Sequence, residues 1–205
     1  MKEKTKNSCN RKCNTHLLLL IIGLLFFSFN ALRADDLETY EIRLLLAEGK
    51  ERLELLEKLS EMYKDISIEK SFNYAQNART LAHELNLIDD EIKSLTLLAQ
   101  AYEIMGNGEQ SLKAFDEAVS LGEQYGKQAA VVDALCMRAG YLIGYFDPSN
   151  AFESLIKAYT IAHNSGDERS MAKSQIEMGR FYRQWKEYEK AIDEINKAID
   201  IYAKI

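Results

Sequence analysis

The 205-residue sequence has a single proline and ten glycines, so few of its residues break helices. It lacks runs in which Val, Ile, Thr and aromatic residues alternate with polar ones, the pattern typical of half-buried strands. Histidine and cysteine are scarce, with three residues of each. These absences argue against strands and against metal centres. With 47% hydrophobic and 28% charged residues, the chain has the balance of a folded protein built from long helices.

A basic start and a short apolar run set residues 1–34 apart. Lysines and arginines gather at the very beginning of the chain, and the almost uniformly apolar run Leu17–Phe29 follows them. Ala31 and Ala34 are candidate cleavage points. This order is the layout of a secretory signal, so we expect export to the periplasm or beyond. Because Leu32 stands where cleavage prefers a small residue, an uncleaved membrane anchor at 17–29 is the alternative.

Cleavage near Ala34 changes both the cysteine count and the net charge. Cys9 and Cys13 precede the apolar run, where lipoprotein acylation is not supported, and Cys136 remains as the only cysteine. No intrachain disulfide can then form. The loss of six basic residues and one acidic residue leaves 20 Lys and Arg against 31 Asp and Glu, a net charge near −11. Such a charge argues against binding to nucleic acid or to an anionic membrane surface.

Small residues recur along the rest of the chain at a step of 40. The step is clearest at Ala78, Ala118, Ala158 and Ala198. Apolar residues occur three positions before and three positions after these alanines, which is a helical spacing. Eight positions after the first three alanines come Asn86, Gly126 and Gly166, residue types that suit the left-handed turn at the end of a helix.

A second helical segment precedes each of these helices. It contains L-A-x-x-Y at Leu98 and M-G-x-x-Y at Met178, and Arg138 takes the same place in the third unit. Each 40-residue period therefore encodes two antiparallel helices. Leu59 is one residue out of phase in the first unit, which predicts a shorter turn there. Arg138 predicts a local distortion, because its counterparts are apolar.

These residues carry a family resemblance. The pattern L-G-x-x-Y followed by A-x-x-x-F-x-x-A resembles the tetratricopeptide (TPR) repeat, and the best copy runs from Met178 to Ala198. The usual closing proline is absent and the period is 40 rather than 34, a variant that resembles exported input regions of bacterial sensor kinases and regulators. The resemblance covers residues 51–205. It implies an all-α, right-handed solenoid of about four helical hairpins.

The two ends of the expected array differ. Asp35 and Asp36 can cap a helix that Gly49 ends, so we expect an N-terminal capping helix. The chain then divides into a secretory segment, a capping helix and a repeat domain at 1–34, 35–50 and 51–205. Apolar residues of the last helix lie near a face that no polar helix covers. Because repeat arrays need terminal caps, we expect self-association, a docked partner or a downstream domain at this end.

No group of residues supports catalysis or a cofactor. His83 and His163 lie two repeats apart, at least ~20 Å along the stack, so they cannot share a metal ion. The G-x-G at 106–108 lacks the preceding strand and the third glycine of a phosphate-binding loop, and it falls at an inter-hairpin turn. Cys136 has no histidine nearby in the pattern. We therefore expect no metal, no cofactor and no enzymatic activity.

The resemblance to TPR proteins implies a concave groove lined by one stripe of each first helix. Glu57 and Glu61 belong to the stripe of the first unit, which makes that end of the groove acidic. The stripes of the later units read Lys93, Thr96, Gln100, Glu103; Asp133, Cys136, Gly140, Ile143; and Lys173, Ile176, Arg180, Arg183. The spacings of three, four and three place each stripe on one helix face. The candidate binding residues are Lys93, Gln100, Glu103, Lys173, Arg180 and Arg183.

Arg180 and Arg183 can pair with acidic groups on a peptide or a partner helix. The alternative is that the stripes are ordinary solvated faces. The sequence thus favours an exported TPR scaffold that binds a protein or peptide in its groove. The second hypothesis is the extracytoplasmic input part of a signal-transduction protein whose effector domain lies elsewhere.

Overall fold

The computed structural model describes residues 36–205. The expected secretory signal at 1–34, with its alternative anchor at 17–29, lies outside the described residues. A helix over 36–46 belongs to a first unit that ends at Ala47, and Glu48–Ile205 form a second unit. A helix thus forms where a capping helix was expected, and its capping role stays a prediction. None of the helices within 36–205 combines the length and the apolar character that crossing a membrane requires.

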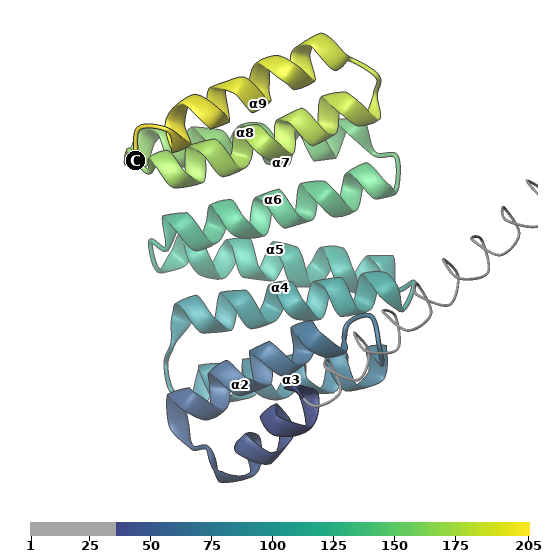
Figure 1. Cartoon of the computed structure of the whole chain (residues 1–205), viewed down its shortest axis with the longest axis vertical. Coiled ribbons are helices and arrows are strands. Elements are labelled where there is room, and N and C mark those ends of the chain that lie inside the picture. Colours follow the sequence, from purple (N-terminus) through teal and green to yellow (C-terminus); the bar gives the residue numbers. More distant parts are fainter. Residues whose placement is uncertain (1–35) are drawn as a thin grey trace, which may run out of the picture. The chain divides into compact units, whose positions relative to one another are not determined.

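The second unit consists of four helical hairpins (Figure 1). The first two are α2 (Gly49–Tyr63) with α3 (Ile68–Glu84), and α4 (Ile88–Ile104) with α5 (Gly108–Gln124). The last two are α6 (Gln128–Gly144) with α7 (Pro148–Ser165), and α8 (Glu168–Gln184) with α9 (Tyr188–Tyr202). This arrangement confirms the predicted all-α solenoid of TPR-like hairpins.

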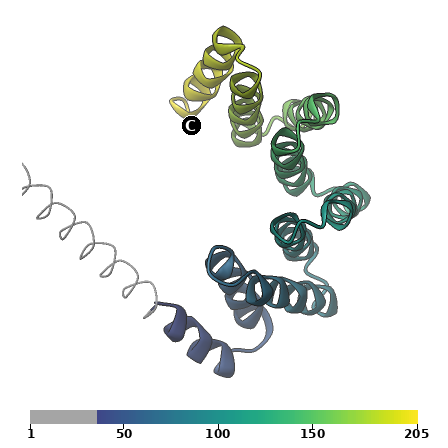
Figure 2. The same cartoon turned by 90° about the vertical axis from the view of Figure 1, so that its right-hand side faces the viewer.

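The helices of the second unit form two layers around a concave side (Figure 2). The first helices of the hairpins, α2, α4, α6 and α8, follow one another along the inner side and contact each other in that order. The second helices α3, α5 and α7 lie on the outer side. Each hairpin contacts only its neighbours along the chain. The surface that a bound partner would meet on the concave side therefore comes from the first helices.

The turns between helices recur at half the period of the alanines. A residue with a φ between +54° and +74° follows each of six successive helices, at Asn86, Gly106, Gly126, Phe146, Gly166 and Lys186. The next N–H in the chain then returns to a carbonyl five positions earlier, as from Leu87 to Ala82 at 3.0 Å. This Schellman geometry satisfies carbonyls at the helix end. Each period thus has two halves, and from α3 to α8 each half is a helix of 17 or 18 residues with a short turn.

Three local predictions are wrong. The first turn is longer rather than shorter, because α2 ends at Tyr63 and α3 begins at Ile68. The turn at Gly106 joins the two helices of one hairpin rather than two hairpins. Arg138 leaves α6 undistorted, because its guanidinium donates to Ser154 Oγ at 2.6 Å and pairs with Asp116 at 2.9 Å.

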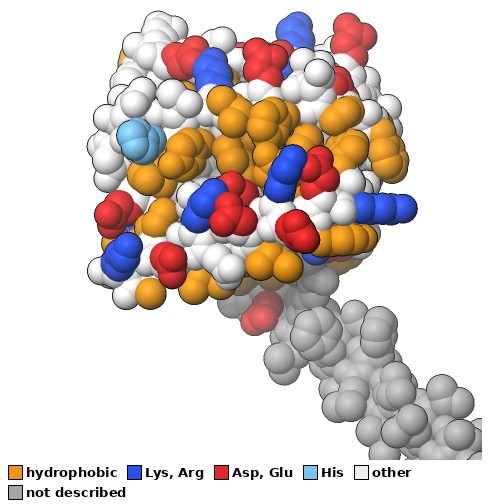
Figure 3. All heavy atoms as spheres, turned by 90° about the horizontal axis from the view of Figure 1, so that it is seen from above, with side chains coloured by type: hydrophobic (Ala, Val, Ile, Leu, Met, Phe, Trp, Pro, Cys, Tyr) orange, Lys and Arg blue, Asp and Glu red, His pale blue; other side chains and the backbone are white. Residues whose placement is uncertain are grey.

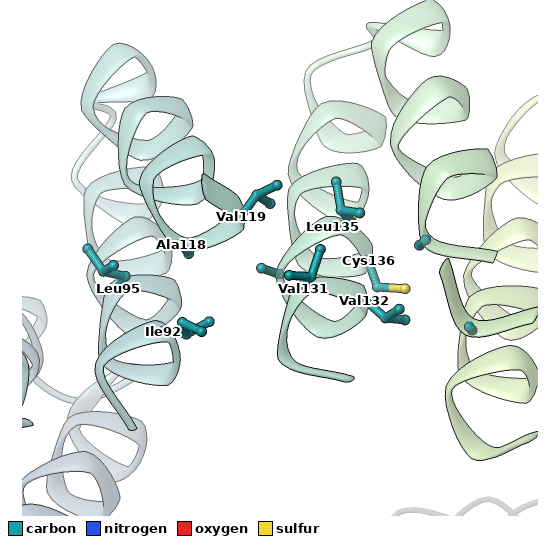
Figure 4. Packing of buried hydrophobic residues seen from close by; sticks show 11 residues of the cluster. Ile92, Leu95, Ala118, Val119, Val131, Val132, Leu135 and Cys136 are labelled. Atoms are coloured by element: carbon teal, nitrogen blue, oxygen red, sulfur yellow. The ribbon is translucent and has the colours of Figure 1, made fainter. Parts of the chain in front are cut away.

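Small side chains occupy the helix crossings of the core. Ala78, Ala118 and Ala158 are completely buried, and Ala198 is 1% exposed. Larger apolar residues of α4, α5 and α6 surround Ala118, and Figure 4 shows Ile92, Leu95, Val119 and Val131 among them. Two helices approach to 8–10 Å only when the side chains at their crossing are small. The periodic alanines are therefore confirmed as crossing positions.

We expect Ala118→Asp to lower the free energy of unfolding by more than ~3 kcal/mol, because it buries a carboxylate that has no partner. Urea denaturation followed by circular dichroism measures the change. Ser120→Asp is the control, since this serine of the same helix is exposed. An Ala118→Asp protein as stable as that control would contradict the assignment of this crossing.

Candidate functional site

An open groove of about 600 Å³ runs over the inner layer between α2, α4 and α6. We call it the inner groove. Its charged lining residues are Glu61, Lys64, Asp89, Asp90, Lys93 and Asp133. Leu97, Ala130 and Met137 give it an apolar floor. Charged rims over an apolar floor suit the binding of a polypeptide better than the enclosure of a small molecule.

A second hollow, of about 220 Å³, continues the inner groove toward α8 and shares Gln100 and Met137 with it. We call it the inner notch. Its lining brings together four of the six candidate binding residues: Gln100, Glu103, Lys173 and Arg180. Lys93 lies in the inner groove, while Arg183 lies outside both hollows. The structure therefore brings four of the candidates together, and their role in binding stays a prediction.

The second position of the stripe is buried in three units, although Thr96 and Cys136 still border the inner groove and the inner notch. Glu57, Thr96 and Cys136 are only 2%, 5% and 2% exposed. The reason is that successive inner helices contact one another, and this position faces the contact. Glu57 is thus not an acidic group of the groove. The acidic end predicted there comes instead from Glu61 and Asp90, which line the inner groove.

Lys93 is held by a structural ion pair. Its Nζ lies 2.6 Å from Oε2 of Glu57 on the neighbouring inner helix, and Ser94 Oγ donates to Oε1 of the same carboxylate at 3.4 Å. Burial raises the pKa of the Glu57 carboxyl, and Lys93 offsets only part of that effect. Burial lowers the pKa of Lys93, but the hydrogen bond and charge of Glu57 outweigh it, so this pKa is raised.

Two further ion pairs connect first helices of successive hairpins. Lys173 Nζ lies 2.5 Å from Asp133 Oδ1, and Lys127 Nζ lies 2.5 Å from Asp89 Oδ2. All four side chains are at least 37% exposed, so each pair adds little to stability. Lys173, like Lys93, is therefore already occupied within the array and offers a partner only its remaining hydrogen-bonding capacity.

Arg180 and Arg183 differ in how much they are engaged. Arg180 pairs with Glu177 at 3.1 Å while its side chain stays 61% exposed. Arg183 is exposed and forms no ion pair within residues 36–205. Both border a third hollow, of about 310 Å³, between α8 and α9. At the basic end of the inner surface, Arg183 is therefore the arginine that remains available to a partner.

The titrating groups of the inner notch do not form an acid–base pair. Burial raises the pKa of Glu103, with Lys64 opposing it, and burial raises the pKa of Glu177, with Arg180 and Lys173 opposing it. The two shifts have the same direction, whereas an acid and a base need opposite ones. Burial also raises the pKa of Cys136 to about 12, so this residue is a neutral thiol rather than a nucleophile.

A groove of about 630 Å³ also lies on the outer side, between α3 and α5. Two of its basic residues are already paired there: Arg79 with Glu117, and His83 Nδ1 with Glu91 Oε1 at 3.2 Å. This groove involves only the first two hairpins, whereas the inner surface reaches from α2 to α8. In the part of the chain from residue 36 onward, no three metal-binding side chains cluster.

The family model of the soluble NSF attachment protein, SNAP, matches residues 90–204, from the first turn of α4 to the end of α9. The chain belongs to the soluble NSF attachment protein family. The match covers the last three hairpins, so the TPR-like repeats of this SNAP-family chain are the part that carries it. No curated protein sequence matches the chain.

Several solved structures share the fold. BtubC from P. vanneervenii is 17% identical, with a TM-score of 0.62 over 82% of this chain and 74% of that one. A Rap protein complexed with competence and sporulation factor is 19% identical, with a TM-score of 0.67 over 82% of this chain and 48% of that one. A kinesin light chain with TPR-like repeats from Podosopora anserina is 16% identical, with a TM-score of 0.60 over 85% and 89% of the two chains. The SNAP-family chain thus spans about half of the Rap protein.

The Glu57–Lys93 pair predicts a pH dependence of stability. Because the pKa of Glu57 is raised on folding, the unfolded chain releases this proton first as the pH rises above about 4.3. The folded state then binds more protons, so Glu57 opposes stability increasingly as the pH rises through the folded-state pKa. Wild type should therefore lose stability relative to Glu57→Gln as the pH rises above about 4.3.

Urea denaturation at several pH values measures this difference, with Glu54→Gln, an exposed glutamate of the same helix, as the matched control. Titrating groups that Glu57 and Glu54 do not influence are common to the three proteins and cancel. A difference between wild type and Glu57→Gln that stays constant with pH, or grows in favour of wild type, would show that the carboxylate is not held in a desolvated site.

Proposed function

We propose that the chain is an exported scaffold, not an enzyme, that binds a protein or peptide partner along its inner groove and inner notch. The observation that carries the proposal is the continuity of this surface across all four first helices. Three steps of about 10 Å between inner helices give a length of about 30 Å, enough for about nine extended residues. The apolar floor can contact the apolar side chains of a bound segment, and the charged rims can form ion pairs with its charged side chains.

The unpaired charges along this surface favour one orientation of a bound segment. Glu61 and Asp90 lie at the α2 end and form no ion pair within residues 36–205. At the α8 end, Arg183 lies beside this surface, next to the exposed Arg180, and forms no ion pair within residues 36–205. A partner segment with a basic end over α2 and an acidic end over α8 complements this distribution. Arginine is suited to that role because its guanidinium can hold a carboxylate with two parallel hydrogen bonds.

The relatives support a binding role. The name of the family describes attachment to another protein. One of the similar structures is a Rap protein complexed with competence and sporulation factor, so a protein that contains this fold binds a factor. Export to the periplasm or beyond is part of the proposal and rests on the basic and apolar order of residues 1–34.

We expect Arg180→Glu/Arg183→Glu to abolish capture of the partner from an envelope extract without changing helical content. The double variant replaces attraction for acidic groups by repulsion at the α8 end. Lys113→Glu/Arg169→Glu is the control, because it changes the net charge equally at two residues that line neither the inner groove nor the inner notch. Binding that persists in the arginine variant, or fails equally in the control, would show that the basic stripe is ordinary solvated surface.

The second candidate function is the extracytoplasmic input part of a signal-transduction protein. It is favoured by the exposed apolar face of α9, where a further segment can dock. The intact mass of the native protein, measured in soluble and membrane fractions, separates the two. A soluble species that begins near residue 32 or 35 is expected for the scaffold. A membrane-bound species that retains residues 1–34, or one heavier than 23.5 kDa, would favour the input part instead.

A further inference from the structure

Helix α9 carries a strip of large apolar side chains that other residues within 36–205 cover only in part. Figure 3 shows hydrophobic side chains gathered across this end of the array, between charged ones. The strip, here called the α9 seam, consists of Tyr188, Ile192, Ile195, Ile199 and Tyr202, and all but the half-buried Ile195 are between 48% and 61% exposed. An exposed apolar surface bordered by charges is typical of an interaction site.

The earlier hairpins show what such a face does in this fold. Phe72 of α3 and Phe152 of α7 take the place of Ile192 in their own hairpins, three periods and one period earlier. Phe72 packs edge-on against Tyr102 of α4 at 5.1 Å, and Phe152 packs against Phe181 of α8 at 5.3 Å. In these two hairpins this position is therefore covered by the first helix of the next hairpin. At α9 the same position is open.

Tyr202 shows that the occupant of the α9 seam differs from another first helix. The equivalent residues are the buried Ala82, Gly122 and Ala162. At Gly122 the backbone passes so close to Val131 that a Cβ atom would collide with it. If a first helix packed on α9 in the way that α6 packs on α5, it would collide with the ring of Tyr202 at this point. The seam therefore fits a helix that packs with larger side chains at the contact.

We propose that the occupant is a second copy of this chain, paired through α9 against α9 in the parallel direction. The residues of the seam are spaced four, three, four and three, which is the a/d spacing of a coiled coil. In that register the β-branched Ile192 and Ile199 take the a positions, and Tyr188, Ile195 and Tyr202 take the d positions. The proposal does not depend on the groove-binding function.

The charges beside the seam complement each other in this orientation. Arg183 of α8 borders one side, and Glu189 lies about 100° around α9 from Tyr188, on the other side. Neither forms an ion pair within residues 36–205. A two-fold axis parallel to α9 places Arg183 of each copy at the level of Glu189 of the other. Other charged residues of α9 are already paired, as Lys190 is with Glu187 and Lys197 with Asp193.

The area available matches a modest dimer. The end of the array formed by α8 and α9 is about 25 Å long and about 20 Å wide, from the rise and diameter of two helices. Two such faces together bury about 1,000 Å², at the lower limit of specific protein interfaces. We therefore expect a dimer in reversible equilibrium with its monomer rather than a permanent one.

Sedimentation equilibrium of the native protein tests the proposal, with wild type expected to form dimers as concentration rises. Ile192→Ser/Ile199→Ser should raise the dissociation constant about 100-fold or more, because four isoleucines leave the interface. Ile104→Ser/Ile156→Ser is the control, since these isoleucines are also partly exposed but lie on α4 and α7. Wild type that stays monomeric, association into open chains, or an unchanged dimer in the α9 variant would overturn the proposal.

A charge exchange tests the parallel orientation independently of the packing variants. Arg183→Glu alone should weaken the dimer several-fold, and Arg183→Glu/Glu189→Arg should restore it. A double variant as weak as the single one would refute the parallel pairing. The two proposals can fail separately, because Ile192→Ser/Ile199→Ser leaves Arg180 and Arg183 in place. That variant should still capture the partner, because Arg183 is then not shared with Glu189 of a second copy.

Discussion

The array depends on helix crossings that admit no side chain larger than alanine. Ala118 has no exposed surface, and at Gly179 the side chain of Ile195 fills the space in which a Cβ atom would lie. These crossings fix the distance between the two helices of each hairpin. The regular left-handed turns then make every hairpin a near copy of the last.

The inner surface combines groups that hold the array together with groups that remain available. Lys93 and Lys173 each reach an acidic residue of the preceding first helix, so their charge is used within the structure. Arg183 forms no such pair in the described part of the chain. The basic residues of the stripes therefore differ in role. A bound partner interacts electrostatically mainly with those that are not already paired. The paired lysines connect successive first helices and so hold the binding surface in place.

The sequence predicted the fold well because its strongest signal, the regular recurrence of small residues, reports the helix crossings directly. It predicted the shared surface of Gln100 and Arg180 because helical spacing fixes which side chains lie on one face. It failed at Glu57, whose burial results from contact between inner helices rather than from a property of its own helix. It also missed the left-handed Phe146, because the helix-end hydrogen bonds impose that conformation on a residue type that rarely adopts it.

The strictly local contacts of the hairpins make local opening unequal along the array. Only Ala191 and Ala198 of α9 are buried, whereas α6 buries residues on several sides between its neighbours. In a single copy, α9 can therefore fray while the other hairpins stay folded, since no contact joins the two ends of the four-hairpin unit. Amide protection would then rise from α9 toward α6, and each lost hairpin would shorten the inner surface by about 10 Å.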